Sequence, residues 1–267
     1  MKGRLLGIVL AFAVPCSVPG QSPLTGEQIL RQAVEIGKQQ DALREQYLYR
    51  DHVEILEWKR DGSSGRVLDR RDFEVFYLEG FPYRRLTAIN GKPLTGEQEA
   101  AEVEKLKMTA AERRAALTQG RRKFFSAGNR PEDILRLLSH VLAGEEMVGG
   151  RKAWVVRSEA GKDAAAAPAS GASVLCYRYT SWIDQESGVI AQQDFEVVRK
   201  GVDTEPGTKS RAVYSTEDGS PWFLRSMEGK FILKRADGEH RSVERHTTSG
   251  FRQFSAESAL SFEPEQK

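Results

Sequence analysis

A metal site or an acid–base catalyst in this 267-residue chain would have to use its four histidines, His52, His140, His240 and His246. His240 and His246 are six residues apart, roughly 20 Å along an extended chain, which is too far to share a metal ion unless the chain folds back. His140 lies in an apolar stretch with no acidic or thiol partner at helical spacing. The histidine pattern therefore favours no metal site.

The sequence signatures of common catalytic sites are also missing. The chain contains no GxSxG, HExxH or CxxC motif and no glycine-rich phosphate loop. Carboxylate pairs such as Glu145 and Glu146 occur, but with 38 acidic residues such pairs are expected on solvated faces. We therefore expect neither an enzyme nor a bound cofactor. A hydrolase whose site only the fold assembles is an alternative.

The first 20 residues have the parts of a secretory signal. Lys2 and Arg4 precede an apolar run at 5–14, and small residues follow, so cleavage is expected after Gly20. This apolar run is shorter than the roughly 18 residues that span a bilayer, and the rest of the sequence contains no apolar run of that length. We therefore expect no transmembrane segment in the mature chain. These features predict a periplasmic protein, with lipidation of Cys16 as the alternative to simple cleavage.

Charge and cysteine content narrow the possible partners. The chain has 40 Lys and Arg against 38 Asp and Glu, and removal of Lys2 and Arg4 with the signal would make the numbers equal. A neutral chain gives no electrostatic reason to bind nucleic acid, and the basic cluster at 121–123 is expected to be a solvated loop. Cys176 would be the remaining cysteine, without an intramolecular partner, and its apolar neighbours predict a small buried side chain.

Hydrophobic periodicity predicts a helix followed by antiparallel strands in the first part of the chain. The segment PLTGEQ at 23–28 has the Thr-x-x-Gln spacing of a capping box, and a helical pattern follows it. Two-residue alternation then predicts strands over 47–58, 73–77 and 83–89. The alternation slips at Leu56, which indicates a β-bulge.

A helical insertion over 93–142 is predicted next. PLTGEQ recurs at 93–98, and we interpret it as a reused helix start because different elements follow the two copies. A third helix is predicted over 129–142, where apolar residues such as Ile134 and Leu138 recur at helical spacing.

The remainder of the chain is predicted to be mostly strands. The stretch 161–171 lacks large apolar side chains and predicts a loop inside the domain. The fold class is therefore α+β, a large meandering antiparallel sheet with about three helices in a single domain over 21–267. The predicted strands lie near 147–148, 153–157, 174–183, 189–199, 209–216, 221–227, 230–236 and 239–249.

Apolar and aromatic side chains occupy both parities of several strands, for example Trp182 on one and Tyr177 and Tyr179 on the other. A sheet with one solvated face needs apolar side chains on one parity of each strand only. Either helices and loops cover the two faces, or a strongly curved sheet encloses an apolar cavity that amphipathic helices close.

The segment SWIDQESGVIAQQDFEV at 181–197 resembles the W-I-D-x-x-S/T-G hairpin of the LolA-like superfamily, which comprises periplasmic lipoprotein carriers and outer membrane lipoprotein-sorting-like proteins. The segment SGFRQFSAESAL at 249–260 also resembles their closing strand. The resemblance implies an open, curved half-barrel with helices covering its concave face. In the hairpin, Asp184 is expected to cap the turn that Ser187 helps to form, while Trp182 packs the strand.

We therefore expect an exported, non-enzymatic protein that binds a hydrophobic ligand, an acyl chain, lipid or lipidated peptide, inside the curved sheet. The expected partners are this ligand or lipoprotein acyl chains, with an envelope protein as a further candidate. An envelope-stress sensor or protein-interaction module on the same scaffold is an alternative. The candidate cavity residues share one parity of successive strands: Tyr47, Tyr49, Val53, Ile55, Phe73, Val75, Tyr77, Trp154, Val156, Tyr177, Tyr179, Phe195 and Val197.

Overall fold

A computed structural model describes residues 24–59, 61–119, 131–161, 174–200, 205–217, 219–235 and 238–253. The signal sequence with Cys16, the basic cluster at 121–123 and most of the predicted loop at 161–171 lie outside the described residues.

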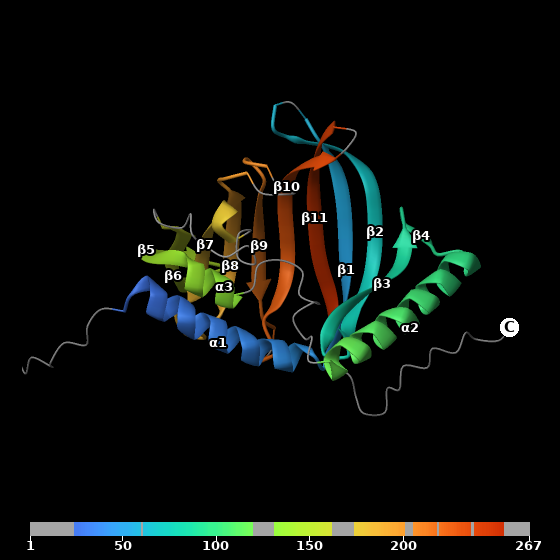
Figure 1. Cartoon of the computed structure of the whole chain (residues 1–267), viewed down its shortest axis with the longest axis horizontal. Helices are drawn as coiled ribbons and strands as arrows, with labels where there is room; N and C mark the ends of the chain where they lie inside the picture. The colour runs from blue at the N-terminus through green and yellow to red at the C-terminus, as the bar shows by residue number, and fades with distance from the viewer. Residues whose placement is uncertain are drawn as a thin grey trace, which may run out of the picture.

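The described chain forms three α-helices, one short 3₁₀ helix and eleven strands (Figure 1). The helices are α1 (Gly26–Arg44), α2 (Gly96–Thr118), α3 (Pro131–Leu137) and η4 (Val174–Cys176). None of these described helices has the length and apolarity needed to cross a membrane. The strands are β1 (Tyr47–Trp58), β2 (Ser64–Leu78), β3 (Phe81–Ile89), β4 (Lys92–Pro93), β5 (Leu138–Val148), β6 (Arg151–Ala160), β7 (Tyr177–Asp184), β8 (Ile190–Val197), β9 (Lys209–Ser215), β10 (Phe223–Arg235) and β11 (Gly238–Gln253).

All eleven strands belong to one antiparallel sheet, which is open and does not close into a barrel. Its order is β4-β3-β2-β1-β11-β10-β9-β8-β7-β6-β5, so the first and last strands of the chain pair near the middle. Figure 1 shows the sheet curved, with α1 lying across its concave side. The predicted α+β class, a curved antiparallel sheet with three helices, is confirmed.

Local sequence signals account for several element boundaries. At α1, the Thr25 side chain accepts a hydrogen bond from the Gln28 backbone, and the Gln28 side chain accepts one from the Thr25 backbone. The second PLTGEQ copy starts α2 with the same reciprocal pair. The slip predicted at Leu56 is an irregularity in the pairing of β1 with β2, as expected for a bulge.

One face of the sheet, which we call the inner face, carries α1 and α3. Ile29 and Leu30 of α1 pack against Val156 and Ile183, and Ile134 of α3 packs on the same cluster. Because directly paired residues of antiparallel strands share a face, the register assigns strand residues to this inner face or to the opposite, outer face.

Helix α2 packs instead on the outer face. Its Leu106 joins a cluster with Leu48 and Phe76, whose side chains have the opposite parity to those beneath α1. Arg113 of α2 donates hydrogen bonds to the backbone carbonyls of Leu78 and Phe81, both at 2.9 Å. The expectation that helices cover the concave face thus describes α1 and α3 but not α2.

Several predicted elements differ from the structure. The third helix, expected over 129–142, ends at Leu137, because residues 138–148 pair with β6 as an edge strand. The strands expected at 221–227 and 230–236 are one strand, β10, whose pairing with β11 is unbroken from Ser226 to Arg235.

Candidate functional site

The thirteen candidate cavity residues all lie on the inner face. They come from β1, β2, β6, β7 and β8, and pairs such as Tyr49 with Val75 and Tyr179 with Phe195 are directly opposite each other. The strand alternation therefore placed them on a common face. They fall into two groups that differ in what covers them.

Six of the thirteen lie in the covered half, the part of the inner face over β6, β7 and β8. Here Val156, which is fully buried, and Trp154 pack beneath α1. Tyr177, Tyr179 and Phe195 pack together with α3 and η4, with the Tyr177 ring centroid 5.6 Å from that of Phe195. Val197 is buried opposite Tyr177. The chain's own side chains occupy much of this space.

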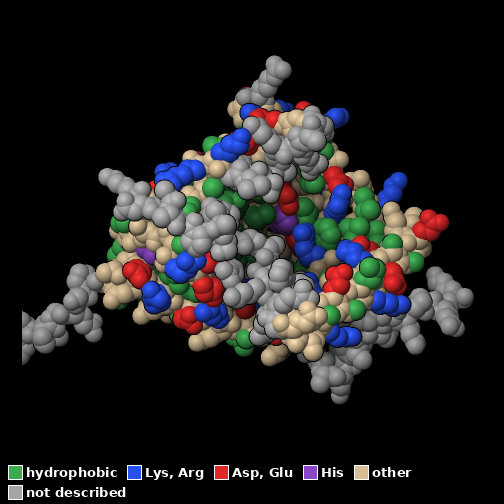
Figure 2. Space-filling view, in the orientation of Figure 1, with side chains coloured by type: hydrophobic (Ala, Val, Ile, Leu, Met, Phe, Trp, Pro, Cys, Tyr) green, Lys and Arg blue, Asp and Glu red, His purple; other side chains and the backbone are tan. Residues whose placement is uncertain are grey.

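The other seven lie in the open half, the part of the inner face over β1 and β2. The helix α1 packs mainly against β5, β6 and β7 and reaches these strands with its C-terminal end. Val53 and Val75 are buried, whereas the remaining five, Tyr47, Tyr49, Ile55, Phe73 and Tyr77, are half-buried. Figure 2 looks onto this face and shows hydrophobic side chains gathered beside a central hollow.

An ionic cluster around the buried residues Asp51 and His246 interrupts the apolar surface of the open half. His246 of β11 contacts Asp51 of β1 at 3.2 Å through Nδ1 and Glu244 at 2.7 Å through Nε2. Arg84 of β3 contacts Asp51 at 2.8 Å and lies 4.1 Å above the ring of Phe73. Sequence analysis missed this cluster, although Asp51 and Glu244 are polar residues at inner-face positions.

The cluster has balanced charge at neutral pH. Burial alone would lower the pKa of His246, but hydrogen bonds to Asp51 and Glu244 outweigh it and raise the pKa to about 9. The hydrogen bond with His246 in turn lowers the pKa of Glu244. The imidazolium and Arg84 therefore face two carboxylates, so the cluster has no net charge. The ion pair of Arg71 with Asp69 lies on the same face, opposite Val53 and Ile55.

The hairpin between β7 and β8 forms as expected. Asp184, which is 1% exposed, accepts hydrogen bonds from the backbone and hydroxyl of Ser187 and two from Arg151. Burial alone would raise the pKa of Asp184, but these hydrogen bonds lower it to about 2. The predicted turn cap is confirmed, and Arg151 is a partner that the sequence did not indicate.

The other candidate chemical groups do not converge on a catalytic site. His140 lies on β5, not on a helix, and its Nδ1 is 2.8 Å from Oγ of Ser158. Ser158 is fully buried, and Nε2 of His140 contacts the backbone carbonyl of Leu135, so this pair has neither substrate access nor an orienting carboxylate. Among the described residues, no three His, Cys, Asp or Glu are grouped to hold a metal ion.

Cys176 differs from its prediction. It is half-buried at the end of η4, with Sγ 3.6 Å from the carbonyl oxygen of Lys200. The first three residues of the strand predicted at 174–183 form this 3₁₀ turn, which moves Cys176 away from the packed face.

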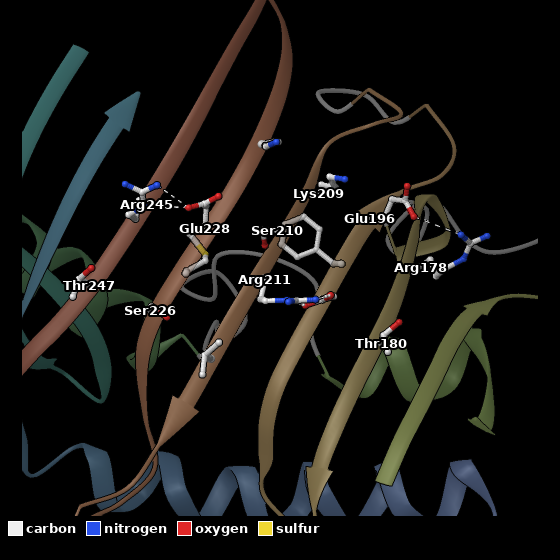
Figure 3. A pocket seen from close by; sticks show the side chains of 15 residues that line it. Arg178, Thr180, Glu196, Lys209, Ser210, Arg211, Ser226, Glu228, Arg245 and Thr247 are labelled. Atoms are coloured by element: carbon white, nitrogen blue, oxygen red, sulfur yellow. Dashed lines mark hydrogen bonds and ion pairs between the residues drawn. The ribbon is translucent and has the colours of Figure 1, made fainter. Parts of the chain in front are cut away.

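The outer face carries a polar cavity of about 760 Å³ over β7 to β11 (Figure 3). Ion pairs line it, including Arg211 with Asp194 at 2.7 Å and Arg245 with Glu228 at 2.9 Å. These pairs belong to a row of alternating charges directly opposite one another on six neighbouring strands: Asp194, Arg211, Glu228, Arg245, Glu54 and Arg70. Mutual pairing across strands is typical of a solvated sheet face.

Comparison with known proteins gives similarity in structure only. No protein-family model matches the sequence, and no curated protein has significant sequence similarity to it. Among solved structures, an outer membrane lipoprotein-sorting protein domain from Vibrio parahaemolyticus matches with a TM-score of 0.39 and 11% identity, over 85% of this chain and 94% of that one.

Two further matches have similar coverage. A LolA superfamily protein from Nitrosomonas europaea matches with a TM-score of 0.34 and 12% identity, over 87% of this chain and 94% of that one. A DUF1329 family protein from Desulfovibrio piger matches with a TM-score of 0.36 and 13% identity, over 84% of this chain and 92% of that one. These matches are similarities in structure to a lipoprotein-sorting domain, a LolA superfamily protein and a DUF1329 family protein.

Proposed function

We propose that the protein is an exported, non-enzymatic binding protein of the periplasm that holds a hydrophobic ligand, such as an acyl chain, against the open half of the inner face. Export is inferred from the N-terminal 20 residues, and residues 21–267 are taken as one domain with a helical insertion. The observation that carries the proposal is the set of half-buried apolar side chains on β1 and β2, beyond the main contacts of α1.

The energetics suit this role. Burial of an acyl chain contributes about 0.8 kcal/mol per methylene, so a chain of about twelve carbons would gain roughly 10 kcal/mol before the cost of ordering it. The outer-face cavity suits such a ligand less well, because paired charges line it and burying them would remove their hydration.

A fluorescent fatty acid, titrated into the mature protein, tests the proposal. Ile55→Glu places a carboxylate on the inner face of β1 and is expected to weaken binding at least about tenfold. Val67→Glu is the matched control, because Val67 is an exposed apolar residue on the outer face of the neighbouring strand. Ile55→Glu should unfold at a lower temperature than Val67→Glu, because residue 55 is half-buried opposite Asp69 and Glu244, so binding is measured where both variants are folded.

Lipids extracted from protein purified out of the envelope fraction, analysed by mass spectrometry, would identify the natural ligand. The proposal fails if the wild-type protein neither co-purifies with lipid nor binds the fatty acid. It also fails if the two glutamate variants bind equally well.

A further inference from the structure

The C-terminal end of α1 places an incompletely satisfied guanidinium against the inner face. Arg44 donates hydrogen bonds to the Trp222 carbonyl at 2.9 Å and to Asp41 at 2.7 Å. Its Nε is buried and has no hydrogen-bond partner among the described residues. Its side chain is only 17% exposed, so the guanidinium is held in place, with Nε enclosed by the protein.

Three tyrosines from separate strands lie around this guanidinium. Tyr49 of β1, Tyr77 of β2 and Tyr214 of β9 are all on the inner face, and the register pairs Tyr49 with Val75, next to Tyr77. Among the described residues, none of the three hydroxyls has a hydrogen-bond partner. Arg44 donates to the Trp222 carbonyl, Tyr214 packs on the cluster that contains Trp222, and Tyr49 packs against the adjacent Phe223, so contacts through these two residues place the guanidinium near the tyrosines. The positive charge of Arg44 also acts to lower the pKa of all three phenols.

The three hydroxyls are proton donors throughout the physiological range. Burial raises the pKa of Tyr49 to about 12 and also raises the pKa of Tyr77 and of Tyr214. Unused donors from four elements therefore lie at one end of the open half. The acidic groups that act on them are Asp41, which is mostly exposed and bound to Arg44, Asp51, which is bound to Arg84 and His246, and Glu45.

Apolar side chains lie along β1 beyond this group of donors, on both sides of Asp51. Tyr49 packs against the rings of Phe223 and Phe251, at centroid distances of 5.8 and 5.3 Å. Asp51, Val53 and Ile55 follow on the same face, and the six residue steps from Tyr49 to Ile55 span about 20 Å of strand. The surface thus offers hydrogen-bond donors at the α1 end, and beyond it the apolar side chains share the face with the charge-balanced cluster around Asp51 and His246.

We propose that Arg44, Tyr49, Tyr77 and Tyr214 bind the head group of an amphiphilic ligand, a carboxylate or a phosphate, while its acyl chain lies along β1. This inference rests on the proposed function and narrows it to ligands whose head groups accept several hydrogen bonds. Carboxylates and phosphates match donors that converge in this way, because each has several acceptor oxygens.

Calorimetric titration of the mature protein with ligands of equal chain length tests the inference. Dodecanoate and dodecyl phosphate are expected to bind at least about tenfold more tightly than dodecanol and dodecylamine. The double variant Tyr77→Phe/Tyr214→Phe should lose this preference and keep the affinity for dodecanol, because only hydroxyls are removed. Tyr177→Phe, in the covered half, is the matched control and should retain the preference.

The outcomes separate this inference from the proposed function. If all four long-chain ligands bind equally, or if the double variant keeps the preference, the head-group site is wrong while the hydrophobic site stands. If no long-chain ligand binds, the proposed function itself fails. If acetate or inorganic phosphate binds as tightly as dodecanoate or dodecyl phosphate, the donors form an anion site without an acyl chain, and the inference is overturned.

Discussion

At the scale of single residues, His246 couples the stability of the sheet to pH. The imidazole is 7% exposed and contacts a carboxylate through each nitrogen, so folding raises its pKa from 6.5 to about 9. A raised pKa stabilises the folded state fully below about pH 6.5, and this contribution is lost as the pH rises through about 9. The shift corresponds to about 3 kcal/mol, as an order of magnitude.

Urea unfolding of the wild type and of His246→Gln at pH 6.0, 7.5 and 9.5 measures this contribution. The difference in unfolding free energy between the two proteins should be largest at pH 6.0 and shrink by about 3 kcal/mol at pH 9.5. His52→Gln is the control, since His52 is a half-exposed residue whose partner Asp72 lies on the outer face. A constant difference across the three pH values would contradict the assignment of a charged, buried imidazole.

Asp184 is expected to be among the most sensitive positions in the β7–β8 hairpin. Asp184→Asn should lower the free energy of unfolding by about 1–3 kcal/mol at pH 7, because an amide cannot replace all four hydrogen bonds that the buried carboxylate accepts from Ser187 and Arg151. Since folding lowers the pKa of Asp184 to about 2, its contribution is present above about pH 3.8 and is lost as the pH falls towards 2.

Glu186→Gln provides the comparison for Asp184, because Glu186 bonds to the same arginine but is 84% exposed. Its substitution should change the unfolding free energy by less than about 1 kcal/mol. Chemical denaturation at pH 7 and pH 4 measures both variants. Equal effects of the two substitutions would show that the arginine pair, and not the buried turn cap, dominates.

At the scale of elements, the two PLTGEQ copies begin helices with identical caps but differ in what surrounds them. A Cβ atom at Gly26 would lie 2.6 Å from the Leu142 nitrogen and 2.7 Å from the Val141 carbonyl carbon, both backbone atoms of β5. A Cβ at Gly96 would meet nothing within 4 Å. Glycine at 26 therefore permits the close approach of α1 to the edge strand, whereas at 96 it belongs to the cap alone.

Alanine substitutions at the two glycines should separate these roles. Gly26→Ala is expected to lower the free energy of unfolding by about 1–3 kcal/mol, because α1 or β5 must shift. Gly96→Ala should leave it unchanged or raise it by up to about 1 kcal/mol, since alanine favours the helix. Thermal unfolding of the two variants decides the matter, and equal destabilisation would mean that the cap, not the contact with β5, requires glycine.

The boundary between α3 and β5 shows where sequence periodicity stops being informative. Ile134, Leu138 and Val141 fit a helix, yet the chain changes to a strand at Leu138. The pairing of Leu138 with Ala160 and of His140 with Ser158 determines this change, and both partners are about 20 residues away. A local pattern cannot represent a hydrogen-bond ladder formed with a distant segment.

At the scale of the whole molecule, alternation along strands was enough to place the candidate residues on one face, because side chains of a strand alternate strictly between faces. It could not show which part of that face the helices fill. The covered part depends on where α1 packs on the sheet. The contacts of Ile29 with Ile183 and of Arg44 with Trp222 determine this position, and they join α1 to segments far away in the sequence. The clusters around His246 and Arg44 escaped prediction for the same reason, since their members come from distant strands.

The division of the inner face predicts that stability and ligand binding respond to different isoleucines. Ile183 is 1% exposed and lies beneath α1, so Ile183→Ala should lower the free energy of unfolding by about 2–5 kcal/mol. Ile55 is half-buried in the open half, so Ile55→Ala should lower the free energy of unfolding by only about 1 kcal/mol. Fatty-acid affinity should show the reverse order, with Ile55→Ala weakening binding about fivefold and Ile183→Ala leaving it unchanged at temperatures where the variant is folded.

Paired measurements of urea unfolding and fatty-acid titration on the two alanine variants test this division. If Ile183→Ala weakens binding as much as Ile55→Ala while remaining folded, the ligand must displace α1 from the covered half. The inner face would then act as one site whose helix moves on binding. If only Ile55→Ala weakens binding, α1 is a fixed part of the core, and the open half alone determines how much of an acyl chain the protein can hold.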